Sequence, residues 1–133
     1  MKILLDTNIL YSFINWPQGH INQLIRYYQS KNDLYLCPYV LEELKEIMYK
    51  KSKVNTVIGF ERITRDIERI AFGMNFKVIN SIPKQKYLCH TRDKKDDRIL
   101  DAAICGNMDA VLTGDKDLIE FRCNKIKILN IHQ

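Results

Sequence analysis

The sequence predicts an α/β domain with a mainly parallel, five-stranded sheet and helices on both faces. Residues 3–5 and 110–112 are short aliphatic runs without alternating polar residues, the pattern of strands that are covered on both faces. Between such runs, apolar residues recur at helical spacing. The resulting order, β-α-α-β-α-α-β-α-β-α-β, indicates a parallel sheet, because parallel neighbours are joined by helical crossovers.

The first half of the chain contains two predicted strands and three predicted helices. The strands cover residues 2–5 and 34–37, and the first helix begins at Thr7. A second helix has apolar residues at positions 21, 24, 25 and 28, and Pro38 starts a third helix over residues 39–50.

The second half continues the alternation. A long helix is predicted over residues 55–72, closed by Gly73 in a C-terminal cap. Residues 80–90 show no legible pattern. Strands are predicted at residues 76–79, 109–114 and 125–131, the last at an edge of the sheet, with a helix after residues 91–98 and a helical turn at 118–121.

Composition and length indicate one domain over residues 1–133. The chain is 46% hydrophobic, and its 21 Lys and Arg against 16 Asp and Glu give a net charge of +5, which fits an anionic partner such as nucleic acid. No apolar run approaches the roughly 20 residues that span a bilayer, and no signal peptide is visible. We therefore expect a cytoplasmic protein.

The cysteines and histidines show no metal-ligand or redox spacing. We interpret the cysteines as small buried hydrophobic residues. The residues concerned are Cys37, Cys89, Cys105, Cys123, His20, His90 and His132.

Carboxylates follow the predicted strands or begin the next helices. They are Asp6, Glu43, Asp96, Asp97, Asp115 and Asp117. Parallel strands bring these positions to one edge of the sheet, where two carboxylates ~4 Å apart repel by about 4 kcal/mol at an effective dielectric of 20. Oxygen ligands without His or Cys select Mg²⁺ or Mn²⁺, which suits phosphodiester hydrolysis. Each acid alone is equally compatible with a helix cap or a solvated position.

Three segments resemble the PIN domain family, close to its toxins of toxin–antitoxin pairs. They are residues 4–10 (LLDTNIL), 92–103 (RDKKDDRILDAA) and 110–118 (AVLTGDKDL). The resemblance covers almost the whole chain and implies a Mg²⁺- or Mn²⁺-dependent ribonuclease with a PIN-like fold.

The resemblance also implies roles for residues in the first half. Asp6 matches the first metal ligand, with Asn8 as a supporting polar residue. Glu43 matches the second acid, in preference to its neighbour Glu42. Cys37 departs from the Ser or Thr that is usual before this helix.

The remaining positions come from the second half. The spacing to the following core leucine and alanine favours Asp96 as the third acid, and Asp97 stays open. Asp115 matches the fourth acid. Thr113 would orient Asp115 or the water, and Asp117 would assist.

The expected partners are an RNA substrate, a small antitoxin and a second copy of the chain in a homodimer. A housekeeping RNA-processing nuclease and a non-catalytic RNA-binding or interaction module remain alternatives. A receiver domain is disfavoured, because it needs a second acid beside Asp6 and an acid after the third strand, and the sequence has neither. A haloacid-dehalogenase-like phosphatase is disfavoured, because it needs an acid at position 8, where this sequence has Asn8.

Overall fold

The structure is a computed structural model that describes residues 1–16, 18–53, 55–79, 94–120 and 126–131. For residues 71, 72 and 94–97 it describes the backbone alone. Within these ranges the chain forms five strands and six helices in the predicted order. None of these helices has both the length and the apolar character needed to cross a bilayer.

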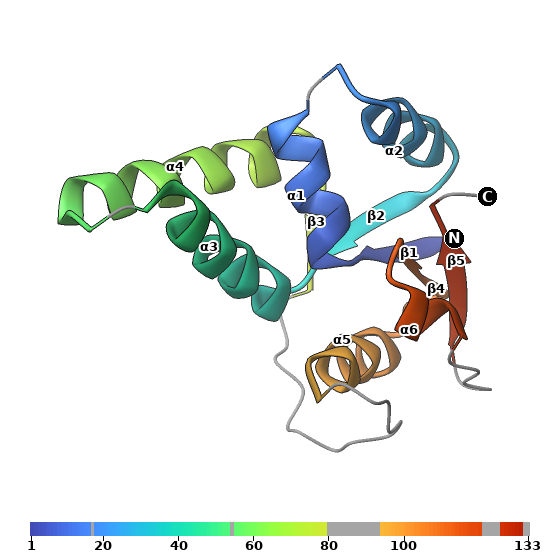
Figure 1. Ribbon diagram of the computed structural model, residues 1–133. Helices are drawn as coiled ribbons and strands as arrows, with labels where there is room; N and C mark the ends of the chain where they lie inside the picture. Colours follow the sequence, from blue (N-terminus) through green and yellow to red (C-terminus); the bar gives the residue numbers. More distant parts are fainter. Residues whose placement is uncertain (17, 54, 80–93, 121–125, 132–133) are drawn as a thin grey trace.

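The sheet is entirely parallel, with strand order β3-β2-β1-β4-β5 (Figure 1). This confirms the predicted α/β architecture. The strands are β1 (Lys2–Leu5), β2 (Asp33–Leu36), β3 (Lys77–Val78), β4 (Ala110–Thr113) and β5 (Lys127–Asn130). The central strands are the aliphatic ones, and Ile3, Leu4 and Leu5 have no exposed surface because helices cover both faces.

Helices α1 and α2 lie above β1 and β2 in Figure 1, whereas α5 and α6 lie below the sheet. This separation follows from right-handed crossovers that leave β1 in one direction and reach β4 in the other. The helices are α1 (Thr7–Asn15), α2 (His20–Lys31), α3 (Pro38–Ser52), α4 (Val57–Gly73), α5 (Lys94–Cys105) and α6 (Lys116–Glu120).

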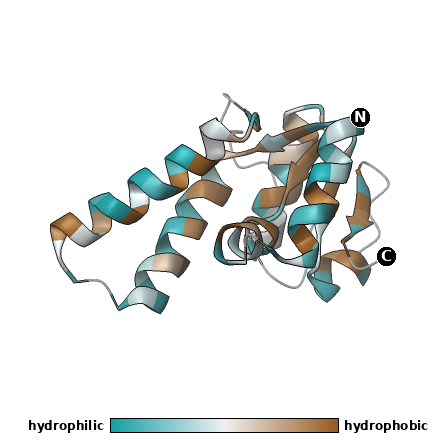
Figure 2. Ribbon diagram, turned by 90° about the horizontal axis from the view of Figure 1, so that it is seen from above, coloured by the Kyte–Doolittle hydropathy of each residue, from teal (hydrophilic) through white to brown (hydrophobic). Residues whose placement is uncertain are grey.

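Helices α3 and α4 pack together as a hairpin that extends away from the sheet (Figures 1 and 2). Ile63 and Ile67 of α4 are buried as its periodicity indicates. Val57 and Ile58, at the far end of the hairpin, are 72% and 71% exposed. The apolar spacing therefore extends beyond the part of α4 that packs on the core.

Two sequence expectations are wrong. Gly73 is the last helical residue, and the left-handed turn falls on Asn75, with φ of 60°; asparagine adopts this conformation more readily than most residues that have a side chain. Cys105 is exposed, because it ends α5 at the surface, whereas Cys37 is buried as expected. Cys89 and Cys123 lie outside the described residues, as does the segment without a legible pattern.

Candidate active site

The candidate site lies at the carboxyl ends of β1 and β4, the neighbouring central strands. The connection after β1 leads toward β2, and the connection after β4 leads toward β5 on the opposite side, so the strand order reverses here. Such a switch point leaves a crevice in which open α/β sheets bind ligands. Asp6 follows β1 directly, and its backbone N–H donates to the Leu112 carbonyl at 3.1 Å, which sets Asp6 beside Thr113.

Asp6 is 4% exposed, and both of its carboxylate oxygens accept hydrogen bonds. Oδ1 accepts from the Thr7 backbone N–H at 2.7 Å, so Asp6 caps α1. Oδ2 accepts from the Thr113 hydroxyl at 2.7 Å. Each oxygen keeps a lone pair, since a carboxylate can accept about four hydrogen bonds. Asp6 is therefore a helix cap that can still coordinate a cation.

The Thr113 hydroxyl connects Asp6 to Asp115. It donates to Asp6, and its oxygen accepts from the Asp115 backbone N–H at 3.0 Å. Asp115 is half-buried, and its Oδ1 accepts from the Asp117 backbone N–H at 3.0 Å as α6 begins. The Asp117 side chain is exposed. Thr113 thus orients the Asp6 side chain and the backbone at Asp115, rather than the Asp115 carboxylate.

The electrostatics of Asp6 reflect its burial among other acids. The pKa of Asp6 is raised from 3.8 to about 6; burial is the largest cause, and the negative charges of Asp115 and Glu43 add to it. The hydrogen bonds from Thr113 and Thr7 lower this pKa by stabilising the charged form. The ionised carboxylate is therefore destabilised unless a cation compensates it.

Glu43 approaches the same edge from the start of α3. Its side chain is half-buried, whereas that of Glu42 is exposed. Glu43 Oε2 is buried and finds no hydrogen-bond partner within the described parts of the chain. A buried carboxylate oxygen without a donor is costly, and a bound cation or water would remove that cost.

Cys37 directly precedes α3. Its thiol makes no capping hydrogen bond. Burial raises the pKa of this thiol to about 11, so Cys37 stays neutral beside the acids. It acts as a small buried hydrophobic residue at this position.

Asp96, Asp97 and Asn8 complete the predicted set. Asp96 and Asp97 fall in the first turn of α5, and their side chains lie outside the described part, so the choice between them stays open. Helix α5 contacts both α3 and β4, and Arg98, which directly follows Asp97, lies over the Tyr39 ring at the start of α3, so the first turn of α5 is near the same edge. Asn8 is exposed in the first turn of α1.

The donor set fits a hard divalent cation. The charges of Asp115 and Glu43 both act on Asp6, and all three residues offer carboxylate oxygens. Among the residues whose side chains are described, no three of His, Cys, Asp and Glu lie close enough to hold an ion in this conformation. A complete ligand set would therefore need an acid from α5 or a small movement of Glu43 and Asp115.

Sequence reasoning gave no functional role to Thr7, Arg98 or Asp101. The Thr7 hydroxyl is buried without a partner in the described chain, and Asp101, one turn after Asp97, is 3% exposed. The Arg98 guanidinium lies 5.3 Å from the centre of the Tyr39 ring, which links α5 to α3. The available sequence signal for Asp101 was a charged residue within the apolar pattern of α5. No sequence signal could have predicted the contact between Arg98 and Tyr39, because the two residues belong to different helices.

The fold and this acidic edge are those of an α/β nuclease domain. The sequence matches the PIN domain over residues 2–117, and the chain belongs to the PIN domain family, whose members are nucleases that generally depend on divalent metals. No curated protein matched the sequence.

Two solved structures share the fold. VapBC2 from Rickettsia felis, solved with a DNA fragment from its promoter, is 20% identical with a TM-score of 0.65, and the alignment covers 98% of each chain. VapBC-1 from nontypeable Haemophilus influenzae is 18% identical with a TM-score of 0.66, covering 100% of both chains. At these identities the likeness concerns the fold.

Thr113→Val should test the link between the two acids. Valine keeps the shape but removes the hydroxyl, so we expect a loss of about 2 kcal/mol of unfolding free energy, as for buried hydrogen bonds to charged groups. Nuclease activity should fall roughly 10- to 100-fold, as when partners of metal ligands are removed. Urea unfolding and cleavage rates measure both effects. Thr113→Ser is the control and should retain activity; equal losses in both variants would mean that packing alone matters here.

Proposed function

We propose that this protein is a Mg²⁺- or Mn²⁺-dependent endoribonuclease that acts as the toxin of a toxin–antitoxin pair. The observation that carries the proposal is the Asp6 carboxylate, held by Thr113 and destabilised first by its burial and then by the charges of Asp115 and Glu43. Acids that repel one another at a ligand-binding crevice are explained by a cation that they hold together.

Asp6, Glu43 and Asp115 would hold the ion, with Asp96 or Asp97 from α5 and assistance from Asp117 and Asn8. When bound, a divalent ion supplies Lewis-acid activation of the attacking water and of the scissile phosphate. Thr113 keeps Asp6 in one orientation through its 2.7 Å hydrogen bond. The Tyr39 ring holds the exposed Arg98 cation between α3 and α5, where it can attract the phosphate backbone.

The toxin assignment is supported by the likeness to VapBC proteins over the full chain. The partner would be a small antitoxin that places an Arg or Lys among the carboxylates, since charge-assisted hydrogen bonds to a carboxylate are strong. We also expect a homodimer, which a measurement of molar mass in solution would test. A short neighbouring gene would favour the toxin over a housekeeping nuclease.

Cleavage of RNA is the decisive test. Purified protein is incubated with end-labelled tRNA, an unstructured RNA and DNA of the same sequence, each in Mg²⁺, Mn²⁺ and EDTA. We expect RNA to be cut internally in either metal and to stay intact in EDTA. DNA cleavage would refute the preference for RNA, and cleavage in EDTA would refute the metal requirement. RNA binding without cleavage would favour the non-catalytic module.

A further inference from the structure

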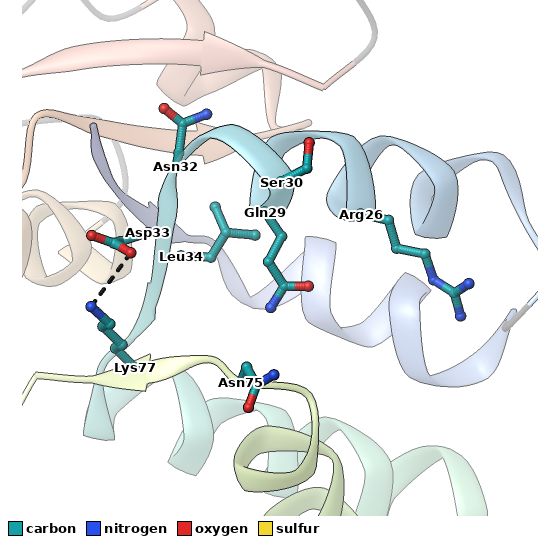
Figure 3. A pocket seen from close by; sticks show the side chains of 8 residues that line it. All are labelled: Arg26, Gln29, Ser30, Asn32, Asp33, Leu34, Asn75 and Lys77. Atoms are coloured by element: carbon teal, nitrogen blue, oxygen red, sulfur yellow. Dashed lines mark ion pairs between the residues drawn. The ribbon is translucent and has the colours of Figure 1, made fainter.

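An open pocket of about 510 Å³ lies at the opposite edge of the sheet, where the strands begin. It is formed by the end of α2, the start of β2 and the turn between α4 and β3 (Figure 3). Its volume falls within the ~300–1,000 Å³ that is typical of small-ligand sites. The acids of the candidate active site are at the other ends of these strands, so the pocket is a separate feature.

Several polar groups of the pocket are free to bind a ligand. Within the described residues, Arg26 and Asn75 make no hydrogen bond or ion pair, and both are exposed. Gln29 Nε2 donates to the Met74 carbonyl at 2.6 Å, which holds the amide in place and leaves Oε1 as an acceptor. In Figure 3 the Gln29 amide points toward Asn75, and Arg26 extends from the same helix.

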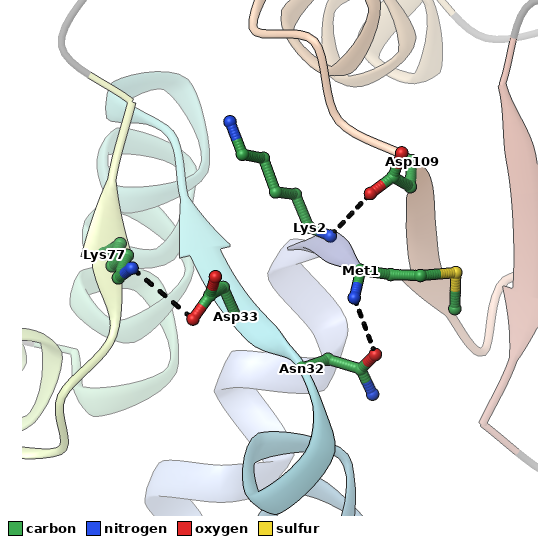
Figure 4. Close-up of polar contacts among 6 residues, drawn as sticks. All are labelled: Met1, Lys2, Asn32, Asp33, Lys77 and Asp109. Atoms are coloured by element: carbon green, nitrogen blue, oxygen red, sulfur yellow. Dashed lines mark hydrogen bonds and ion pairs between the residues drawn. The ribbon is translucent and has the colours of Figure 1, made fainter.

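The edge around the pocket is rich in lysine. Lys2, Lys77 and Lys127 begin three of the five strands, and all are exposed. Two acids also lie here: Asp33 Oδ1 is 3.4 Å from Lys77 Nζ, so these two charges offset each other, and Asp109 Oδ2 accepts from the Lys2 backbone N–H at 2.8 Å (Figure 4). Together with Arg26, the lysines outnumber these acids, which favours an anionic ligand at this edge.

We infer that this pocket binds one nucleotide of a single-stranded RNA, with Arg26 on its phosphate and the Asn75 and Gln29 amides on its base. Arginine suits phosphate because its donors form a planar fork. Amide side chains present a donor and an acceptor that match base edges. A nucleotide presents a phosphate and a base edge with a donor and an acceptor in one unit, whereas a peptide would have to supply its charge and its amide partners from separate groups, so the nucleotide is the better fit.

The inference rests on the proposed function only for the RNA as substrate. A four-residue strand is ~13 Å long, so one RNA can reach both edges only when several nucleotides separate the cut from the pocket. The pocket should therefore strengthen the binding of long RNA and not affect very short RNA.

The test measures binding without catalysis. A fluorescein-labelled 12-nucleotide RNA is titrated in EDTA with the full chain, Arg26→Gln and Asn75→Gly, followed by fluorescence anisotropy; glycine removes the amide and keeps the left-handed turn at this position. We expect each variant to bind roughly tenfold more weakly, as for the loss of one phosphate or base contact. Arg62→Gln is the matched control, because Arg62 is an exposed arginine toward the far end of α4, and it should bind like the unchanged protein.

Two outcomes would overturn the inference. One is that Arg26→Gln loses no more affinity than Arg62→Gln. The other is that an oligoglutamate peptide competes with the RNA in an Arg26-dependent manner and adenosine monophosphate does not, which would assign the pocket to an acidic protein segment.

Cleavage of the same RNA in Mg²⁺ separates this inference from the proposed function. Arg26→Gln should raise KM for the 12-nucleotide RNA, leave kcat unchanged and have no effect on a trinucleotide. Arg26-dependent binding without any cleavage would refute the nuclease and retain the pocket. RNA cleavage in which Arg26→Gln changes neither binding nor KM would refute the pocket and retain the nuclease.

Discussion

Replacing Asp6 with asparagine is expected to reduce metal-dependent RNA cleavage by roughly three orders of magnitude, because electrostatic stabilisation by a bound metal contributes several kcal/mol and each 1.36 kcal/mol changes the rate tenfold. Asp6 is the carboxylate at the centre of the proposed site, bound to Thr113 and influenced by Glu43 and Asp115. Asparagine removes the charge and keeps the shape. Single-turnover cleavage in Mg²⁺ and Mn²⁺ measures the effect.

The fold should survive this substitution. The asparagine oxygen can accept from the Thr7 N–H, as Asp6 Oδ1 does, and its amide can donate to the Thr113 oxygen. Circular dichroism checks the fold. Asp66→Asn is a matched control, because Asp66 is an exposed carboxylate on α4, away from both the acids and the pocket. Unchanged cleavage by Asp6→Asn would show that Asp6 serves only as a helix cap.

The second large effect is a dependence of stability on pH that Asp6→Asn should remove. Asp6 has a pKa of about 6 in the folded protein and 3.8 as its ordinary value. The folded state therefore holds the proton more tightly. Protonated Asp6 therefore stabilises the folded state fully below pH 3.8, and this stabilisation is lost as the pH rises through 6. The free energy of unfolding should fall by about 3 kcal/mol over this range.

Melting temperatures between pH 4 and pH 8 in EDTA test this dependence. As the pH rises, the melting temperature of Asp6→Asn should increase relative to that of the unchanged protein, by up to about 10 °C for a domain of this size. Mg²⁺ should then raise the melting temperature of the unchanged protein more than that of the variant, because a ligand of the folded state stabilises it. A difference that does not vary with pH would contradict the raised pKa. A variant that is less stable at every pH would show that the capping role dominates.

The pattern of hydrophobic residues along the chain was sufficient to predict the fold. The aliphatic runs of β1 and β4 are the two central strands, and the alternation with helices requires parallel pairing. Local signals failed where tertiary packing decides. Cysteine is a residue type that is usually buried, but Cys105 is exposed because α5 ends at the surface. Val57 and Ile58 continue the apolar pattern of α4, but they are exposed because this end of the helix lies beyond the core.

The sequence by itself determined the strand and helix order, the PIN domain family and the positions of the acids at strand ends, because hydrophobic periodicity and motif spacing are local properties. The tertiary structure alone decided what those acids contact. The Thr113 hydroxyl bonds to a residue 107 positions away, and burial among Glu43 and Asp115 raises the pKa of Asp6. The pocket at the opposite edge is also a tertiary feature, since Arg26 and Asn75 belong to distant segments that only the folded sheet brings together. Contacts of this kind depend on the register of strands and the packing of helices, which no local pattern encodes.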